Sequence, residues 1–383
     1  MSFRIFCQSP LFRQKQLVPT LKREFSKRKK KQIEWPRKIV SGVQPTGAVH
    51  LGNYLGAITR WVDLQNSGEN VSFFIADMHS ITLPQDPQQL KKNILEMTAT
   101  LLACGIDPNK STLFLQSTIK QHAELCWIFG CLTTMARLSH LPQYKEKSAT
   151  VKEIPLGLFV YPVLQAADIL IYKLVMQTIE FLPKSNKIKI SRATHVPTGE
   201  DQAQQLQLAQ HLANVFNFRF GETFPICHGI IADDASCRIR SLRDPTKKMS
   251  KSEPDSKSRI LLTDPPEQIL QKVKKAVTDF TSAVYNDPET RPGVSNLISI
   301  HSLMSGLSIE QIVSDVSKLD TGKYKFTVAD AVIAKLTPIR LKIEDYLKNP
   351  EYLVDVLKVG ADKSSQIAEE TLVEVKKKVG LGL

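Results

Sequence analysis

The stretch IVSGVQPTGAVHLGNYLGA, residues 39–57, decides the fold class of this 383-residue chain. Its pattern predicts a strand over 37–43, a turn at 44–47 and an amphipathic helix from His50 to about residue 65. Two later runs, VSFFIA (71–76) and STLFLQ (111–116), have the continuous apolar character of strands buried on both faces. Strands that alternate with helices in this way predict a parallel, doubly wound, Rossmann-like α/β sheet.

The remainder of the chain predicts an α-helical C-terminal domain, because no convincing strand pattern follows residue 265. Helical spacing is found over 265–278, 295–305, 308–317, 327–347 and 350–378. We therefore predict four parts: a basic leader (1–36), a sheet domain (37–242) with an atypical insertion (174–192), a lysine–serine loop region (243–262) and the helical domain (263–383). The last helix is expected to pack back on the sheet domain.

The composition is that of a folded protein, with 42% hydrophobic and 23% charged residues, and it excludes a disordered or collagen-like chain. The net charge is +13, of which +10 belongs to residues 1–38. A leader rich in Lys and Arg and poor in acidic residues resembles a mitochondrial transit peptide. A solvated basic tail and a nuclear or RNA-binding patch at Lys27–Lys31 are the alternatives.

The six cysteines do not have the spacing of a zinc site, so we expect no structural metal. Cys126 and Cys131 lie in an apolar run and are expected to pack in the core. No apolar stretch reaches the length of about 18 residues that a membrane span requires, so no membrane partner is expected.

The turn after the first predicted strand has features of a nucleotide site. Ligands of such sheets bind at the carboxyl ends of the strands, near helix N-termini. Gly47 and Gly52 have no Cβ that would keep a nucleotide away, and His50 can donate a hydrogen bond to phosphate. The backbone N–H groups at the helix start are expected to be available to phosphate. By itself, the pattern also fits a tight turn with a surface histidine.

A second motif, KMSKS (Lys248–Ser252), follows about two hundred residues later. Its two lysines and interleaved hydroxyls can hold a triphosphate and stabilise the charge that develops on departing pyrophosphate. Taken by itself, this lysine- and serine-rich motif also fits an ordinary solvated loop. Together, HLGN (50–53) and KMSKS on an α/β sheet resemble the class I aminoacyl-tRNA synthetases.

Further segments resemble the bacterial and mitochondrial tryptophanyl-tRNA synthetases, from about residue 39 to the C-terminus. They are SGVQPTGAVHLGNYLGA (41–57), ADMHSIT (76–82), QYKEKS (143–148), YPVLQAAD (161–168) and GEDQ (199–202). The resemblance implies that Asp168 accepts the indole N–H of tryptophan. An indole has one donor and no acceptor, so a site that selects it needs a buried acceptor.

The resemblance also assigns the other site residues. Around the amino acid it places Val40, His79, Tyr161, Gln165, Val196, Thr198 and Gln202. Around ATP it places Gln44, Pro45, Thr46, Gly52, Asn53, Gly199, Glu200, Asp201, Ile239, Lys248, Met249, Ser250, Lys251 and Ser252. Catalytic roles are implied for His50, Asn53, Lys147, Lys248, Ser250 and Lys251, with Lys147 as a mobile lysine that reaches the triphosphate.

Three departures from the family pattern keep alternatives open. Gln165, three residues before Asp168, is also found in tyrosyl-tRNA synthetases, which are the second candidate. Val40 and Thr198 stand where relatives have larger apolar groups. Residues 174–192 are an insertion that is either a surface loop or an unspliced intron in the gene model. A smaller nucleotidyltransferase and a non-catalytic RNA-binding paralogue are further alternatives.

The function expected from the resemblance is formation of tryptophanyl-adenylate from L-tryptophan and ATP, followed by transfer to tRNA(Trp). Mg²⁺ is expected to bind through the phosphates. The helical domain is expected to recognise the anticodon, and the enzyme to be a homodimer in the mitochondrial matrix.

Overall fold

The structure is a computed structural model that describes residues 38–141, 153–173, 194–198, 203–225, 227–231 and 239–382. The predicted leader (1–36) and the predicted insertion (174–192) lie outside the described residues.

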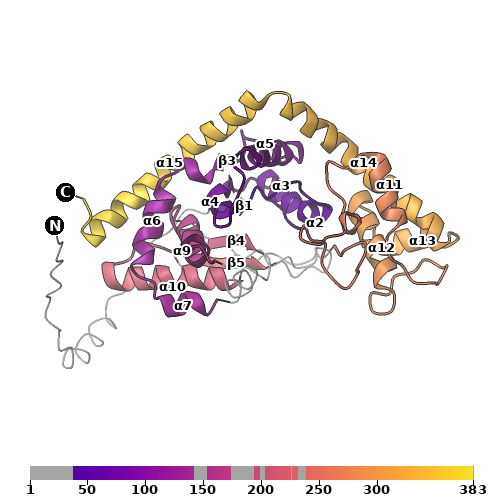
Figure 1. Ribbon diagram of the computed structural model, residues 1–383, viewed down its shortest axis with the longest axis horizontal. Helices are drawn as coiled ribbons and strands as arrows, with labels where there is room; N and C mark the ends of the chain where they lie inside the picture. The colour runs from indigo at the N-terminus through magenta and orange to yellow at the C-terminus, as the bar shows by residue number, and fades with distance from the viewer. Residues whose placement is uncertain are drawn as a thin grey trace. The chain divides into compact units, whose positions relative to one another are not determined.

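The described residues contain a five-stranded, fully parallel sheet in the order β3-β2-β1-β4-β5 (Figure 1). Its strands are β1 (Ile39–Val43), β2 (Val71–Ile75), β3 (Thr112–Leu115), β4 (Thr194–Thr198) and β5 (Cys227–Ile231). The three strands predicted from apolar runs are confirmed. The doubly wound α/β class is confirmed as well.

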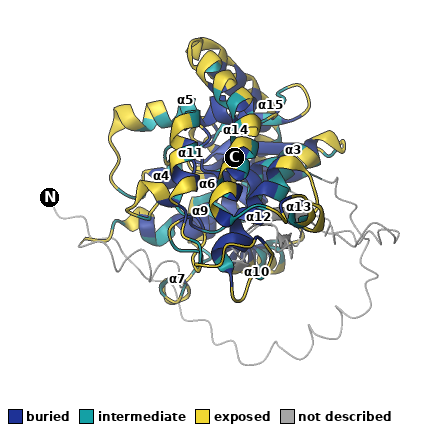
Figure 2. Cartoon of the chain, turned by 90° about the vertical axis from the view of Figure 1, so that its right-hand side faces the viewer, coloured by how far each residue is buried: buried dark blue, intermediate teal, exposed yellow. Residues whose placement is uncertain are grey.

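Side chains alternate between the two faces of the sheet, and each face is covered by its own helices. Val71, Phe73 and Ile75 pack in one apolar cluster, and Phe74 and Phe114 pack in the other. The first cluster includes α3 (Thr59–Asn66) and α5 (Pro87–Ala103); the second includes α6 (Gln121–Gly130), α9 (Leu156–Leu170) and α10 (Ala203–Phe220). Figure 2 shows the interior in dark blue, with exposed positions on outer helix faces and loops.

The helix predicted from His50 is present but contains a π-helical turn that the sequence did not predict. It consists of α2 (Leu51–Asn53), the π turn η1 (Tyr54–Ile58) and α3. The N–H of Thr59 donates to the carbonyl oxygen of Tyr54, five residues back. Such π turns are frequent beside functional sites. This one lies immediately after the histidine–glycine motif.

The helical C-terminal part is confirmed. Its helices are α11 (Pro266–Lys274), α12 (Pro292–Ser305), α13 (Ile309–Asp315), α14 (Thr321–Leu347) and α15 (Pro350–Val379). The last helix contacts β3 and α6 (Figure 1). Gly360 lies so close to β3 that a Cβ on it would be 1.9 Å from the carbonyl oxygen of Leu113.

Short elements complete the described part. They are α4 (Asp77–Ser80), η2 (Gln116–Thr118), α7 (Met135–Ser139) and η5 (Ser256–Ser258). The prediction that Cys131 packs in the core is wrong, because it follows the last turn of α6 and is exposed, whereas Cys126 is half-buried. Within the described ranges, no helix combines the length and apolarity needed to cross a membrane.

Candidate active site

The turn that follows β1 has the backbone geometry of a glycine-dependent site. Gly47 has a φ of +89°, a left-handed conformation in which a Cβ would be strained. Gly52 lies against a side chain on each side: a Cβ there would be 3.1 Å from the His50 ring and 3.5 Å from Cβ of Met249. The glycines therefore let the turn, the histidine and the KMSKS loop approach one another closely.

His50 is the N-cap of α2 and is locked in place by Asn53. The ring Nδ1 of His50 accepts a hydrogen bond from the backbone N–H of Asn53 at 3.2 Å. The backbone N–H of His50 donates to Oδ1 of Asn53 at 3.4 Å. Burial, and to a smaller extent the positive charges of Lys251, Arg259 and Lys248, lowers the pKa of its ring to about 4. The ring is therefore neutral at pH 7, and because Nδ1 accepts, its proton is on Nε2.

The expectation that the helix start offers free N–H groups to phosphate is wrong for two of its residues. The N–H of Leu51 donates to the carbonyl oxygen of Ile260 at 2.8 Å, and that of Asn53 donates to His50. The partner of Leu51 lies more than two hundred residues away, so no local pattern could reveal it.

The KMSKS loop lies against the same turn. Lys248 forms a β-bridge with Arg240, and the N–H of Met249 donates to the buried Ile239 at 3.0 Å. Ser250 and Ser252 share a hydrogen bond of 2.8 Å between their hydroxyl oxygens. These contacts fix the loop, and Met249 lies beside Gly52 of the turn.

Lys251 joins the two motifs directly. Its Nζ donates to the carbonyl oxygen of Gly47 at 3.0 Å. Burial, and to a smaller extent the positive charge of Arg259, lowers the pKa of Lys251 to about 8. The ammonium is therefore still charged at pH 7, but its proton is held less firmly than that of an exposed lysine.

A second group of side chains surrounds Asp168, which is 1% exposed in the interior of α9. Its Oδ2 accepts a hydrogen bond from Nε2 of His79 at 2.7 Å. Its Oδ1 accepts from Nε2 of Gln116 at 2.8 Å and from Nδ1 of His122 at 2.6 Å. A carboxylate has about four lone-pair positions. Three are used within the described part of the chain, and one on Oδ2 remains for a donor.

Asp168 is ionised in spite of its burial. Burial alone would raise its pKa, but the charge and hydrogen bonds of His122 and the hydrogen bond of His79 lower it to about 2. A permanently ionised acceptor in a dry surrounding is strongly attracted to an N–H donor. This is the property expected of a residue that binds an indole.

Other residues predicted around the amino acid lie near Asp168. Tyr161 is two helical turns before it on α9, and its ring is 6.4 Å from that of His79 in an edge-on arrangement. Val40 of β1 packs in the same apolar cluster as α9. Gln165 is half-buried one turn before Asp168.

The nucleotide-side residues outside the two motifs lie on the segment from β1 to α2. Pro45 is buried, whereas Gln44 and Thr46 are exposed at the carboxyl end of β1. Val196 and Thr198 belong to β4, which lies beside β1 in the sheet. Five predicted residues lie outside the described part of the chain: Lys147, Gly199, Glu200, Asp201 and Gln202.

A protein-family profile described as "tRNA synthetases class I (W and Y)" matches residues 31–337. The chain is 44% identical over 346 residues to a tryptophan--tRNA ligase of Caldanaerobacter subterraneus subsp. tengcongensis, covering 90% of this chain and 98% of that one. It is 43% identical over 343 residues to the tryptophan--tRNA ligase of Rickettsia conorii, covering 89% and 98%. The chain belongs to the tryptophanyl-tRNA synthetase family.

Solved structures agree with this membership. Tryptophanyl-tRNA synthetase from Mycoplasma pneumoniae is similar with a TM-score of 0.77 and 30% identity, covering 91% of this chain and 99% of that one. The Campylobacter jejuni enzyme, solved with ADP and tryptophan, is similar with a TM-score of 0.75 and 30% identity, covering 90% and 100%. This tryptophanyl-tRNA synthetase family member is therefore a class I aminoacyl-tRNA synthetase, and hence a ligase that uses ATP.

Two side chains that hold Asp168 were missed by sequence reasoning. Gln116 follows β3 directly, and a polar residue at the carboxyl end of a buried strand was a signal that could have identified it. His122 is the second residue of α6, where no motif or spacing marks it. Only the fold brings it to Asp168.

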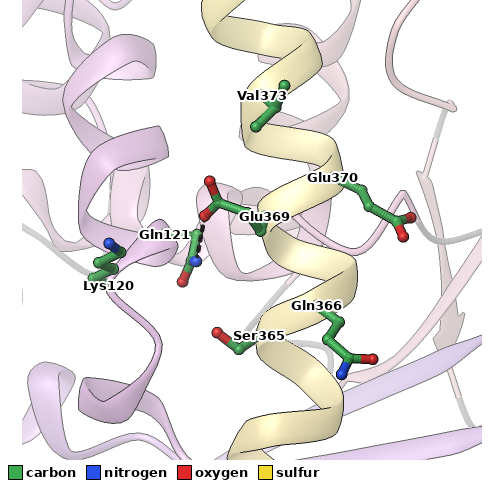
Figure 3. Close-up of a pocket in the computed structure, with 7 residues that line it drawn as sticks. All are labelled: Lys120, Gln121, Ser365, Gln366, Glu369, Glu370 and Val373. Atoms are coloured by element: carbon green, nitrogen blue, oxygen red, sulfur yellow. Dashed lines mark hydrogen bonds between the residues drawn. The ribbon is translucent and has the colours of Figure 1, made fainter.

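A surface groove between two helices lies away from these residues. A groove of about 700 Å³ runs between α6 and α15 (Figure 3) and is lined by Lys120, Gln121, Ser365, Gln366, Glu369, Glu370 and Val373. None of these residues belongs to the predicted site. Gln121 donates to Glu369 across it at 2.6 Å, so the groove is an interhelical seam.

Proposed function

We propose that this synthetase activates L-tryptophan with ATP and transfers it to tRNA(Trp) in mitochondrial translation. The observation that carries the choice of amino acid is the buried, ionised Asp168, whose remaining lone-pair position requires a donor. The indole N–H is a donor and cannot accept, so the side chain of tryptophan matches this requirement.

A second observation supports a ligand that only donates. Oε1 of Gln116 is buried and has no hydrogen-bond partner among the described residues. The Nε2 of the same amide must face Asp168, because a carboxylate cannot donate. The group around Asp168 therefore supplies no free donor from Gln116. A buried acceptor that remains unpaired is costly, so the open position on Oδ2 of Asp168 favours a donor ring over an apolar one.

On the nucleotide side, the proposed reaction is attack of the tryptophan carboxylate on the α-phosphate of ATP, with departure of pyrophosphate. His50 donates from Nε2, and Asn53 and Ser250 supply neutral polar groups. Lys248 and Lys251 supply positive charge where charge develops on the leaving pyrophosphate. Such a transfer depends on positioning and charge stabilisation, so it does not require a covalent nucleophile from the protein.

Mg²⁺ is proposed to arrive with the phosphates. The residues of this site offer imidazole, amide, hydroxyl and ammonium groups, and no group of three or more His, Cys, Asp or Glu in the described ranges could hold a metal ion. Bound to the triphosphate, Mg²⁺ would neutralise negative charge on the same phosphates that the two lysines are proposed to contact.

Amino-acid-dependent exchange of pyrophosphate into ATP tests the proposal, with tryptophan and tyrosine compared side by side. We expect exchange with tryptophan and little with tyrosine. Asp168→Ala should remove the preference for tryptophan over an analogue that has carbon in place of the indole nitrogen, a loss of about 1–3 kcal/mol of discrimination. Exchange with tyrosine alone would support the tyrosyl alternative. Absence of exchange with either would support the RNA-binding paralogue.

A homodimer is proposed for the assembly. Trp127 of α6, Met135 of α7 and Leu156 of α9 are 75%, 76% and 75% exposed, and α9 contacts both α6 and α7. Large apolar side chains exposed on neighbouring helices are typical of an interface. Trp127→Glu should convert a dimer into a monomer in size-exclusion chromatography with light scattering. A wild-type monomer at micromolar concentration would contradict the assignment.

Recognition of tRNA(Trp) is proposed to involve the helical part, 263–383, at the anticodon. Aminoacylation of tRNA(Trp), compared with a tRNA(Trp) whose anticodon is changed, tests this role. We expect charging to fall for the changed tRNA while pyrophosphate exchange is unaffected. Equal charging of both tRNAs would contradict anticodon recognition.

A further inference from the structure

A chain of buried hydrogen bonds lies behind Asp168, on the side away from His79. Nδ1 of His122 is 2.6 Å from Oδ1 of Asp168, and its Nε2 is 2.7 Å from the hydroxyl oxygen of Tyr172. Gln116 donates to the same Oδ1 at 2.8 Å. The four side chains are between 0% and 3% exposed.

The direction of each hydrogen bond follows from the acceptor. The carboxylate can only accept, so Nδ1 of His122 carries a proton and donates to Asp168. Burial, together with the negative charge of Asp168, raises the pKa of Tyr172 well above its usual value, so this hydroxyl keeps its proton. Asp168 therefore requires a proton on Nδ1 of His122, and the Tyr172 hydroxyl holds the ring at its other nitrogen.

These contacts determine what a ligand can meet. Both lone-pair positions of Oδ1 are filled from behind, and His79 fills one position of Oδ2. The N–H donors of Gln116 and His122 are committed to Asp168. A phenol oxygen, which both donates and accepts, would find an acceptor but no donor among these groups. An indole N–H needs only the acceptor.

We propose that Gln116, His122 and Tyr172 are positioning residues that set amino-acid selectivity by holding Asp168 with a single lone pair open to the substrate. This proposal rests on the proposed tryptophan specificity of the same site. The three residues come from the end of β3, from α6 and from the segment after α9. They therefore act on the substrate only through Asp168.

The test compares pyrophosphate exchange with tryptophan and with an analogue that has sulfur in place of the indole nitrogen and so has no N–H. Four variants are needed: Gln116→Met, His122→Leu, His122→Asn and Tyr172→Phe. Gln121→Met is the matched control, because Gln121 is also a buried glutamine that donates to a carboxylate, but in the groove of Figure 3. Thermal melting of each variant measures folding separately.

We expect kcat/KM of the wild type to favour tryptophan over the sulfur analogue by at least about 10-fold. His122→Leu and Gln116→Met should lose most of this preference, and Tyr172→Phe should lose about 3-fold, because the ring of His122 is no longer held at Nε2. His122→Asn should recover most of it, since its amide N–H replaces Nδ1–H. Gln121→Met should keep the wild-type preference, and the KM for ATP should not change in any variant.

A merely structural network would behave differently. Equal losses for tryptophan and the analogue, or no recovery in His122→Asn, would overturn the proposal. If His122→Leu does not fold, Tyr172→Phe and Gln116→Met still test the proposal. A full preference for tryptophan over the sulfur analogue in both variants would contradict the proposal. A wild-type enzyme that exchanges with tryptophan but shows no preference over the analogue would refute the inference alone. A wild type without tryptophan-dependent exchange would refute the proposed function itself.

Discussion

Lys251 donates a hydrogen bond to the carbonyl oxygen of Gly47 at 3.0 Å, across 204 positions of sequence. The contact needs the left-handed turn at Gly47, which turns its carbonyl toward the KMSKS loop. A second connection lies nearby, where the N–H of Leu262 donates to Val49 and that of Leu51 donates to Ile260. Three hydrogen bonds therefore join the segment from Gly47 to Leu51 to the segment from Lys251 to Leu262.

Lys251→Ala should slow adenylate formation by a factor of order 10²–10³, the range expected when a charged donor to the transition state is lost. Tryptophan affinity should hardly change, because Lys251 contacts the turn at Gly47 and not the pocket around Asp168. Single-turnover adenylation and equilibrium tryptophan binding measure the two effects. Lys247→Ala is the control: its ammonium is 73% exposed and pairs with Asp244 on the surface. Normal turnover with weak tryptophan binding in Lys251→Ala would contradict the assignment.

The activity should have an alkaline limb near pH 8. The pKa of Lys251 is lowered to about 8 by burial, so its ammonium is present below pH 8 and is lost as pH rises through that value. The adenylation rate of the wild type should fall there, and the residual rate of Lys251→Ala should not. Burial lowers the pKa of Lys38 to about 8 as well, but this lysine lies over the ring of Tyr172. The adenylation rate of Lys38→Arg should therefore still fall near pH 8. If that fall is absent in Lys38→Arg, the titrating group is Lys38 and not Lys251.

The strands and the motifs were predictable because their signals are local. A short, mostly apolar run such as 71–75 is typical of a strand buried on both faces, and glycine at positions 47 and 52 indicates a close approach of backbone. The resemblance then placed Asp168 in the pocket. Each of these inferences needs only residues that are neighbours in sequence.

What the sequence could not predict depends on distant partners. The N–H of Leu51 donates to the carbonyl oxygen of Ile260. His122 forms a hydrogen bond with Asp168 only because α6 packs on α9. The π turn at 54–58 changes the hydrogen-bond pattern within an ordinary helical sequence. Cys131 belongs to an apolar stretch of sequence, but it lies just past the end of α6 and is exposed.

Gly360→Ala should weaken the packing of α15 on β3. Its Cβ would lie 1.9 Å from the carbonyl oxygen of Leu113, and a backbone atom cannot move aside as a side chain can. We expect a loss of about 1–3 kcal/mol or more in the free energy of unfolding, seen as a lower melting temperature. Gly130→Ala is the control, because its Cβ would have no atom within 4 Å. An unchanged melting temperature of Gly360→Ala would show that α15 is not held against β3.

Deleting residues 2–36 should leave adenylation intact and abolish import into isolated mitochondria. The described fold supports the first expectation, because the pairing of β1 with β2 begins at Ile39. The charge of the leader supports the second. Fusion of residues 1–36 to a fluorescent protein should be sufficient for import. Loss of adenylation by the truncated enzyme would show that the leader belongs to the catalytic fold, and a nuclear location of the fusion would favour the basic-patch alternative.

Excising residues 174–192 should preserve or raise activity. The chain is anchored immediately before the insertion, where Tyr172 is buried against His122 and Lys173 pairs with Glu374 of α15. It is anchored again just after, where β4 pairs with β5 along its whole length and with β1 at Ile39. Both flanks are therefore held by the fold itself, and the entropic cost of closing a loop between them grows only slowly with its length. Pyrophosphate exchange by the excised enzyme, and mass spectrometry of tryptic peptides from the native protein, test the two interpretations. Peptides from within 174–192 would establish a real loop, and their absence beside full coverage of the flanks would establish an intron in the gene model. If those peptides are found and the deletion also eliminates adenylation, the insertion is a working part of the enzyme, and both interpretations are wrong.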